Sequence, residues 1–336
     1  MIGYYVHHQG RGHLHRAGCI AAHSPMRVTV LSSLPRPAAW QGDWVVLPPD
    51  ATDAPTDPTA RGRLHWVPLH HPGHRERMAV IAEWIRGADP ALFVSDVSVE
   101  AATLARLMGT PVVVAAMRGD RQDEAHRLAY DLADALLAPW PSSLPEPDWP
   151  AHWRAKTVHT GSISRYDGRP RPRPGTEAPP LRKEVVVMLG AGGTDISASQ
   201  LQEARRAAPE WTWTVLGGPR APWIEDPWPV LCRASVVITH AGQNAVAECA
   251  AARAPSIVIP QERPHGEQHA TARALAEGGL ATVCDTWPPP HAWPALLAET
   301  VARPDRWADW SPGDGARRAA RVLTDLALRP SGATGA

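Results

Sequence analysis

The sequence contains little lysine and almost no phenylalanine. Lys156 and Lys183 are the only lysines, and arginine supplies the remaining positive charge. Together with abundant alanine and proline, this indicates a GC-rich coding sequence. Lysine and arginine total 34, and aspartate and glutamate also total 34, so the formal net charge is zero. This balance gives no electrostatic reason to expect a nucleic-acid partner.

Cysteine is also scarce, and long apolar runs are missing. The four cysteines, Cys19, Cys232, Cys249 and Cys284, form no CxxC pair, so we expect buried thiols in a reducing compartment. The chain opens without a basic and apolar leader. No uninterrupted apolar run approaches the roughly 18 residues of a membrane span. We therefore expect a cytoplasmic protein with no integral membrane segment.

The length and the apolar content predict two α/β domains. The chain has 336 residues, 44% of them hydrophobic, which is enough for two cores. Short β-branched runs alternate with helical segments in both halves, as in doubly wound parallel sheets. Residues 167–182 repeat proline and arginine without apolar periodicity and predict a linker. We expect one domain over 1–166, a second over 183–312, and a C-terminal helix within 313–336.

The most informative stretch is residues 235–268. Its sequence predicts a buried strand over 235–239, a helix over about 243–252 and a second strand over 256–259. This βαβ unit places a helix N-terminus at the carboxyl edge of a parallel sheet. The first amides of a helix have no partner within the helix, and the helix dipole is positive there. The stretch therefore predicts an anion site.

A carboxylate follows one turn into that helix. Asn244 and Glu248 are four residues apart and share a helix face. A carboxylate there would repel a phosphate group. It can accept hydrogen bonds from the vicinal diol of a ribose, as the acidic residue of dinucleotide-binding folds does. Amides and carboxylate together predict a nucleotide-diphosphate site. The alternative is a plain turn followed by a helix whose small side chains pack on the sheet.

The same stretch resembles the donor-binding signature of nucleotide-sugar glycosyltransferases with two Rossmann-like domains. The positions that carry the resemblance are Thr239, His240, Gly242, Asn244 and Glu248, then Pro255, Pro260, Glu267 and Gln268. The first part is similar to plant UDP-glycosyltransferases, and the interval from Pro260 to Glu267 resembles glycosyltransferase family 28. Two positions depart: Arg253 stands where glycine is usual, and Glu267 replaces Asp or Gln. The second departure leaves the sugar open.

The resemblance implies the GT-B architecture, with two Rossmann-like doubly wound parallel-sheet domains facing a cleft. It implies that the C-terminal helix crosses back to the first domain. It also implies that the second domain binds the donor through His240, Ala241, Gly242, Gln243, Asn244 and Glu248, with Glu267 and Gln268 holding the sugar.

A second glycine loop is expected to join this site. Gly190, Gly192, Gly193 and Thr194 follow a predicted strand and precede a helix, so their amides can hold phosphate. A tight turn is the alternative. Ile224 matches the segment whose backbone holds uracil in family 28. Because an unmatched buried acceptor costs ~1–3 kcal/mol, Glu248 favours UDP over dTDP donors, with GDP left open.

The N-terminal half carries a candidate base. Gly10-x-Gly12-His13 resembles the Gly-His loop whose histidine deprotonates the acceptor in inverting members of the superfamily, and imidazole suits that task. Asp96 matches the aspartate that orients this histidine. The alternative is that His13 caps a helix and Asp96 caps the next one. The rival bases are His7, His8 and His15.

These features predict an inverting, metal-independent glycosyltransferase that uses a UDP-sugar as substrate and needs no cofactor. Asp53 and Asp57 lie in a proline-rich loop, which is the wrong context for a metal-binding Asp-x-Asp pair. The sequence does not identify the acceptor, for which a lipid, a peptide and a natural product stay open. Two alternatives share the fold: a UDP-N-acetylglucosamine 2-epimerase, and a catalytically silent nucleotide-sugar-binding subunit.

Overall fold

The computed structural model describes residues 1–8, 12–171, 183–190, 193–218 and 224–329. Contacts divide the chain into two units. The first unit comprises Met1–Pro139, Glu146–Thr160 and Ala316–Ala336, and the second comprises Trp140–Pro145 and Gly161–Gly315. The sequence placed the boundary in the linker 167–182, most of which lies outside the described residues.

The first unit is built on a seven-stranded, wholly parallel sheet in the order β3-β2-β1-β4-β5-β6-β7. Every residue of β1 and β4 is buried, which explains their continuous apolar sequences, because helices cover both faces of such sheets. The strands are β1 (Ile2–Val6), β2 (Val28–Ser32), β3 (Asp43–Val46), β4 (Leu92–Asp96), β5 (Val112–Ala115), β6 (Ala135–Ala138) and β7 (Thr157–His159).

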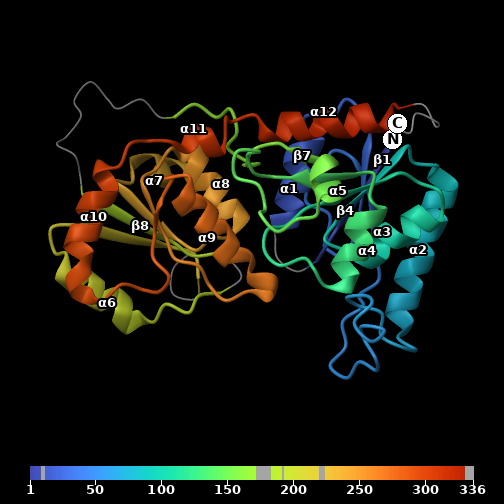
Figure 1. The fold of residues 1–336 in the computed structure, drawn as a ribbon, viewed down its shortest axis with the longest axis horizontal. Helices are drawn as coiled ribbons and strands as arrows, with labels where there is room; N and C mark the ends of the chain where they lie inside the picture. Colours follow the sequence, from blue (N-terminus) through green and yellow to red (C-terminus); the bar gives the residue numbers. More distant parts are fainter. Residues whose placement is uncertain (9–11, 172–182, 191–192, 219–223, 330–336) are drawn as a thin grey trace. The chain divides into compact units, whose positions relative to one another are not determined.

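The helices of the first unit connect these strands and begin at side-chain caps where the sequence supplies them. Ser98 caps α3 and Asp123 caps α4, each accepting the backbone N–H of the third residue of its helix. The C-terminal helix α12 clusters with this unit (Figure 1). The helices are α1 (Gly12–Ala21), α2 (Pro72–Ala88), α3 (Val99–Leu107), α4 (Glu124–Leu132), α5 (Ala151–Ala155) and α12 (Gly315–Ala327).

The second unit has a five-stranded parallel sheet in the order β12-β11-β10-β8-β9. Its core packs β-branched side chains of β8, β10 and β11 against Trp293 and Leu297. The strands are β8 (Glu184–Met188), β9 (Thr212–Leu216), β10 (Val236–Thr239), β11 (Ser256–Val258) and β12 (Thr282–Val283). The helices are α6 (Ala198–Ala207), α7 (Trp228–Arg233), α8 (Gln243–Ala252), α9 (Glu267–Glu277), α10 (Trp293–Ala302) and α11 (Trp307–Trp310). The expected fold class, two doubly wound parallel-sheet domains, is confirmed.

Each sheet reverses its winding direction once. The reversal lies between β1 and β4 in the first sheet and between β8 and β10 in the second. Chain segments leave the two central strands in opposite directions there, and ligands of open α/β sheets bind outside the carboxyl ends of those strands. His13 and Asp96 follow the first pair of strands, and the segments with Thr194 and His240 follow the second. None of the described helices is both long and apolar enough to span a bilayer.

Candidate functional site

The N-terminus of α8 lies at the reversal point of the second sheet. β10 ends at Thr239, and His240 and Ala241 lead to the N-cap residue Gly242. Gly242 has no side chain, so it supplies no capping oxygen to the first amides of this ten-residue helix. A helix end of this kind favours an anion as the partner of those amides.

Space is open beside the glycines of both loops at this edge. Apart from its own chain neighbours, a Cβ atom placed on Gly190, Gly193 or Gly242 would meet no heavy atom of the described residues within 4 Å. Gly193 has a φ of +88°, a conformation that side chains disfavour. β8 and β10 are adjacent strands, so both loops belong to one edge of the sheet. Gly192, which was predicted to take part, lies outside the described residues. The backbone here is accessible to a ligand at close range.

His240 is buried and is held by hydrogen bonds at both ring nitrogens. It is 5% exposed. Nδ1 lies 2.9 Å from the Ile259 carbonyl oxygen, and Nε2 lies 3.2 Å from the Thr194 hydroxyl. A carbonyl oxygen only accepts, so Nδ1 carries the proton and Nε2 accepts from Thr194. Burial lowers the pKa of His240, so the imidazole is neutral. The ring is thus buried like a core histidine at Nδ1, while Nε2 contacts Thr194 in the neighbouring glycine loop.

Glu248 is buried on α8 and paired with an arginine that the sequence reasoning did not identify. Glu248 is 8% exposed. The Arg165 Nε donates to its Oε1 at 2.9 Å, and Arg165 Nη1 donates to the Glu225 carbonyl oxygen at 3.0 Å. Burial raises the pKa of Glu248, and the Arg165 guanidinium opposes that rise. Arg165 is 83 residues away in sequence, and no local pattern marks it.

Gln268 ties two loops of this edge together. Its Oε1 accepts from the Gln261 amide at 2.9 Å, and the Gln261 side chain donates to Asp195 at 3.1 Å. Glu267 is half-buried and is the first residue of α9. Ile224, the residue matched to a base-holding segment, is 38% exposed. Gln261 and Asp195 belong to this network and were not predicted.

The departure at Arg253 has a structural explanation. Arg253 is the C-cap of α8 and has a φ of +51°, the left-handed conformation in which glycine has no steric cost. Arginine adopts it here, and its guanidinium forms an ion pair with Asp305. Arg253 thus holds the left-handed conformation that favours glycine at the end of a helix.

In the first unit, the structure brings His13 and Asp96 together. Asp96 ends β4 and is fully buried, and its Oδ1 lies 2.8 Å from His13 Nδ1. Arg16 donates to both carboxylate oxygens, at 2.9 and 2.6 Å, and the Tyr4 hydroxyl donates at 3.2 Å. Ser98, and not Asp96, caps α3, so the capping interpretation of Asp96 is wrong.

The charge state of Asp96 decides the tautomer of His13. Burial favours the neutral acid, but Arg16 and then His13 outweigh it and hold the pKa of Asp96 well below its usual range. Arg16 Nη2 lies 3.1 Å from His13 Nδ1, but the Asp96 oxygen is closer, at 2.8 Å. An ionised carboxylate only accepts, so this shorter contact favours the tautomer in which Nδ1 carries the proton and Nε2 the lone pair. Of the rival bases, His7 stacks on His8 with ring centroids 4.7 Å apart. Burial lowers the pKa of His7 to about 4.

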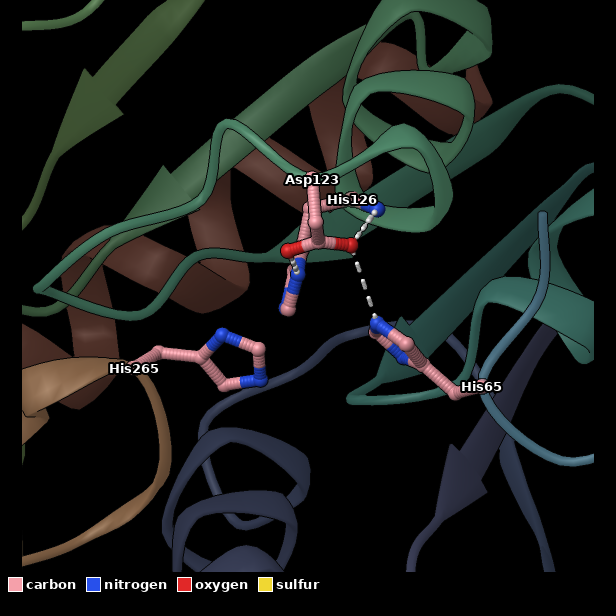
Figure 2. A group of neighbouring side chains, drawn as sticks. All are labelled: His65, Asp123, His126 and His265. Atoms are coloured by element: carbon pink, nitrogen blue, oxygen red, sulfur yellow. Dashed lines mark hydrogen bonds and ion pairs between the residues drawn. The ribbon is translucent and has the colours of Figure 1, made fainter. Parts of the chain in front are cut away.

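A second histidine and aspartate cluster lies in the first unit and was not predicted (Figure 2). Asp123 contacts His126 Nδ1 at 2.5 Å and His65 Nε2 at 3.4 Å. Two imidazoles and a carboxylate this close are typical of a metal site, but the Arg121 guanidinium lies 3.2 Å from His126 Nε2. Burial and then Arg121 lower the pKa of His126 to about 3. With Arg121 donating to Nε2, Nδ1 must donate to Asp123, so these residues form a hydrogen-bonded cluster.

Comparison with known proteins supports the same assignment of the fold. Residues 222–288 match the glycosyltransferase family 28 C-terminal domain. This segment contains Ile224, the whole α8 motif, Glu267 and Gln268. An uncharacterized glycosyltransferase of Methanopyrus kandleri is 34% identical over 96 residues, which are 26% of this chain and 26% of that protein. The match thus spans about a quarter of the relative.

Two solved structures share the fold along almost the whole chain. A UDP-glucosyltransferase from Polygonum tinctorium has a TM-score of 0.64 and 15% identity, covering 97% of this chain and 98% of that one. The spinosyn rhamnosyltransferase SpnG, complexed with thymidine diphosphate, has a TM-score of 0.57 and 16% identity, covering 97% and 96%. The fold is that of a GT-B glycosyltransferase.

Gly242 provides a direct test of the anion site in this glycosyltransferase fold. Its φ of −69° and ψ of 139° suit alanine, and a Cβ there meets only open space. Gly242→Ala is therefore expected to leave the melting temperature unchanged, while its methyl group blocks close approach of a diphosphate and weakens UDP binding at least tenfold by calorimetry. Gly87→Ala, also in open space, is the control. Unchanged UDP affinity in Gly242→Ala would exclude this site.

Proposed function

We propose that the protein transfers a sugar from a nucleotide-diphosphate donor to an acceptor hydroxyl with inversion, and that the donor is a UDP-sugar. The observation that carries the proposal is the edge of the second sheet. There an uncapped helix N-terminus and open glycines are followed one turn later by the buried carboxylate of Glu248. This arrangement lies within the segment that matches a glycosyltransferase domain.

The donor is held by four parts of the second unit. Its diphosphate lies at the Gly242–Asn244 amides, where the helix dipole and the open space favour it. Its ribose diol donates to Glu248. Burial raises the pKa of this carboxyl, and Arg165 opposes that rise and so favours the ionised form. Its base lies along the segment that contains Ile224. Arg165 donates a hydrogen bond to the carbonyl oxygen of the next residue, Glu225. The sugar lies near Glu267 and Gln268.

Glu248 supports a ribonucleotide over a deoxyribonucleotide. The names of the two similar structures include one nucleotide of each kind: UDP for the Polygonum tinctorium enzyme and thymidine diphosphate for SpnG. A diol donates two hydrogen bonds to a carboxylate, and 2-deoxyribose can donate only one. Because Glu248 is buried, water does not replace the missing donor at full strength. The ribose contact therefore favours a UDP-linked over a dTDP-linked donor, and it leaves GDP open.

The first unit supplies the base. His13 Nε2, with its lone pair fixed by the Nδ1–Asp96 contact, takes the proton of the acceptor hydroxyl. The resulting oxygen attacks the anomeric carbon on the face opposite the diphosphate, and the bond from that carbon to the phosphate oxygen breaks with its electron pair leaving on UDP. The Asp96 carboxylate stabilises the imidazolium that forms. Configuration at the anomeric carbon is inverted.

Replacing the base should separate catalysis from donor binding. We expect His13→Ala to lower the turnover number about 10²–10⁴-fold, the usual contribution of a general base, with the UDP dissociation constant unchanged by calorimetry. His23→Ala, in the exposed turn after α1, is the control and should keep full turnover. UDP release is measured with UDP-glucose and UDP-N-acetylglucosamine over a panel of lipid, peptide and natural-product alcohols. Full turnover in His13→Ala would assign the base to another residue.

The role of Glu248 can be measured as a ratio of affinities. Wild type should bind UDP about 5–150-fold more tightly than 2′-deoxy-UDP, the equivalent of ~1–3 kcal/mol. Glu248→Ala should bring this ratio close to one, because neither sugar then meets a carboxylate. Glu203→Ala, an exposed acid on α6, should keep the wild-type ratio. Equal affinities in wild type would contradict the ribose assignment.

The reaction is proposed to need no metal, because the α8 amides and a buried histidine face the charge that develops on UDP. Turnover is therefore expected to be the same after dialysis against EDTA and after addition of Mg²⁺ or Mn²⁺. If turnover is lost in EDTA and either cation restores it, the reaction needs a metal ion and this part of the proposal is wrong.

A further inference from the structure

The hydrogen bonds of His240 constrain what it can offer a ligand. Its Nδ1 must donate to the Ile259 carbonyl oxygen at 2.9 Å. That carbonyl is held in place by the backbone, since the Ile259 amide donates to Thr239 at 2.9 Å. The only nitrogen left for a ligand is Nε2. In the neutral imidazole it has a lone pair and no hydrogen, and it accepts from Thr194.

A diphosphate beside Nε2 could not accept a hydrogen bond from the neutral ring, because this nitrogen carries no hydrogen. Oxygens of an ionised diphosphate are acceptors only, and a lone pair on Nε2 repels them. Moving the proton from Nδ1 to Nε2 would leave the buried Ile259 carbonyl facing a second lone pair, which is unfavourable. The imidazolium is the only form of His240 that donates to Ile259 and to a phosphate oxygen at once.

We propose that His240 takes up a proton when the nucleotide diphosphate binds, so that donor binding is coupled to pH and the imidazolium N–H faces the leaving group. The proton comes from solvent and goes to Nε2, and no covalent bond of the ligand changes. This inference rests on the diphosphate site proposed above and adds a charge to it.

The surroundings of Nε2 make this uptake conditional on the ligand. The Asp195 carboxylate, 4.0 Å away and 68% exposed, favours the charged form. Arg263 opposes it, and burial opposes it most strongly, so the pKa of His240 is lowered in the free protein. The positive end of α8, which begins three residues later, also opposes it. A diphosphate reverses this balance by adding negative charges beside the ring.

The sign of the pH dependence follows from these two states. The pKa of His240 is below its ordinary 6.5 in the free protein and is raised when the diphosphate is present. Affinity is therefore highest at low pH and falls as pH rises through the pKa of the complex, by up to tenfold per pH unit for one proton. When the bond to the sugar breaks, UDP gains a further negative charge, so the imidazolium favours the products over the bound donor.

The experiment is titration calorimetry of the full chain with UDP at pH 7.5, in Tris and in HEPES, whose ionisation enthalpies differ. Measurements stay above pH 7 because the terminal phosphate has its own pKa near ~6. We expect uptake of close to one proton per UDP, and none for uridine, which has no diphosphate. dTDP should give the same uptake as UDP, because the two share the diphosphate.

Two variants isolate the histidine. His240→Gln carries an amide that is neutral at every pH, so UDP binding should continue with no uptake and with little pH dependence. Asp195→Asn changes a mostly exposed side chain, so it should fold normally. It should reduce the uptake at pH 7.5 because the imidazolium loses a favourable charge. It serves as the test if His240→Gln is unstable.

Three results would overturn the inference. UDP binding to wild type without proton uptake would do so and would leave the proposed function standing. Uptake that is unchanged in His240→Gln, or in Asp195→Asn if the first variant does not fold, would assign the proton to another group. If neither UDP nor dTDP binds wild type, the inference and the proposed function both fail.

Discussion

The reversal of winding in each parallel sheet is the constraint on which both candidate sites depend. Where neighbouring strands are followed by segments that leave in opposite directions, the carboxyl edge stays open between them. In the first sheet this edge lies beyond β1 and β4 and holds His13 and Asp96. In the second sheet it lies beyond β8 and β10 and holds the glycines and His240. The chemistry of each unit is thus placed by strand order.

An arginine lies beside the acid at each edge: Arg16, which is buried, and Arg165, which is exposed. Arg16 keeps Asp96 ionised although burial favours the neutral acid, and Arg165 acts in the same direction on Glu248. In both positions the guanidinium favours the ionised carboxylate, the form that accepts hydrogen bonds from a histidine or a ribose. Each proposed role of an acid therefore relies on its neighbouring arginine.

Much of the second unit could be predicted because its information is local. The helix start at Gly242, the strand before it and the acid at Glu248 follow from spacing within one βαβ unit, and the fold class followed with them. α5 and α7 were not predicted, because they are short, begin beside prolines and carry tryptophans instead of a clear apolar period. The cluster of His65, Asp123 and His126 was also missed, since His65 lies in the loop before α2 while Asp123 and His126 lie at the start of α4.

By itself the sequence determined the alternation of strands and helices, the glycine turns and the acid one turn into α8. Periodicity and turn chemistry act over a few residues, so they can be read along the chain. Only the tertiary structure decided that Arg16 and His13 bind the Asp96 carboxylate. The same holds for the hydrogen bond from Arg165 to Glu248 and for the one from His240 Nδ1 to the Ile259 carbonyl oxygen. Those partners are 19 to 83 residues apart in sequence. They meet because strand order brings the loops of each unit to one edge of its sheet, which no pattern along the chain can show.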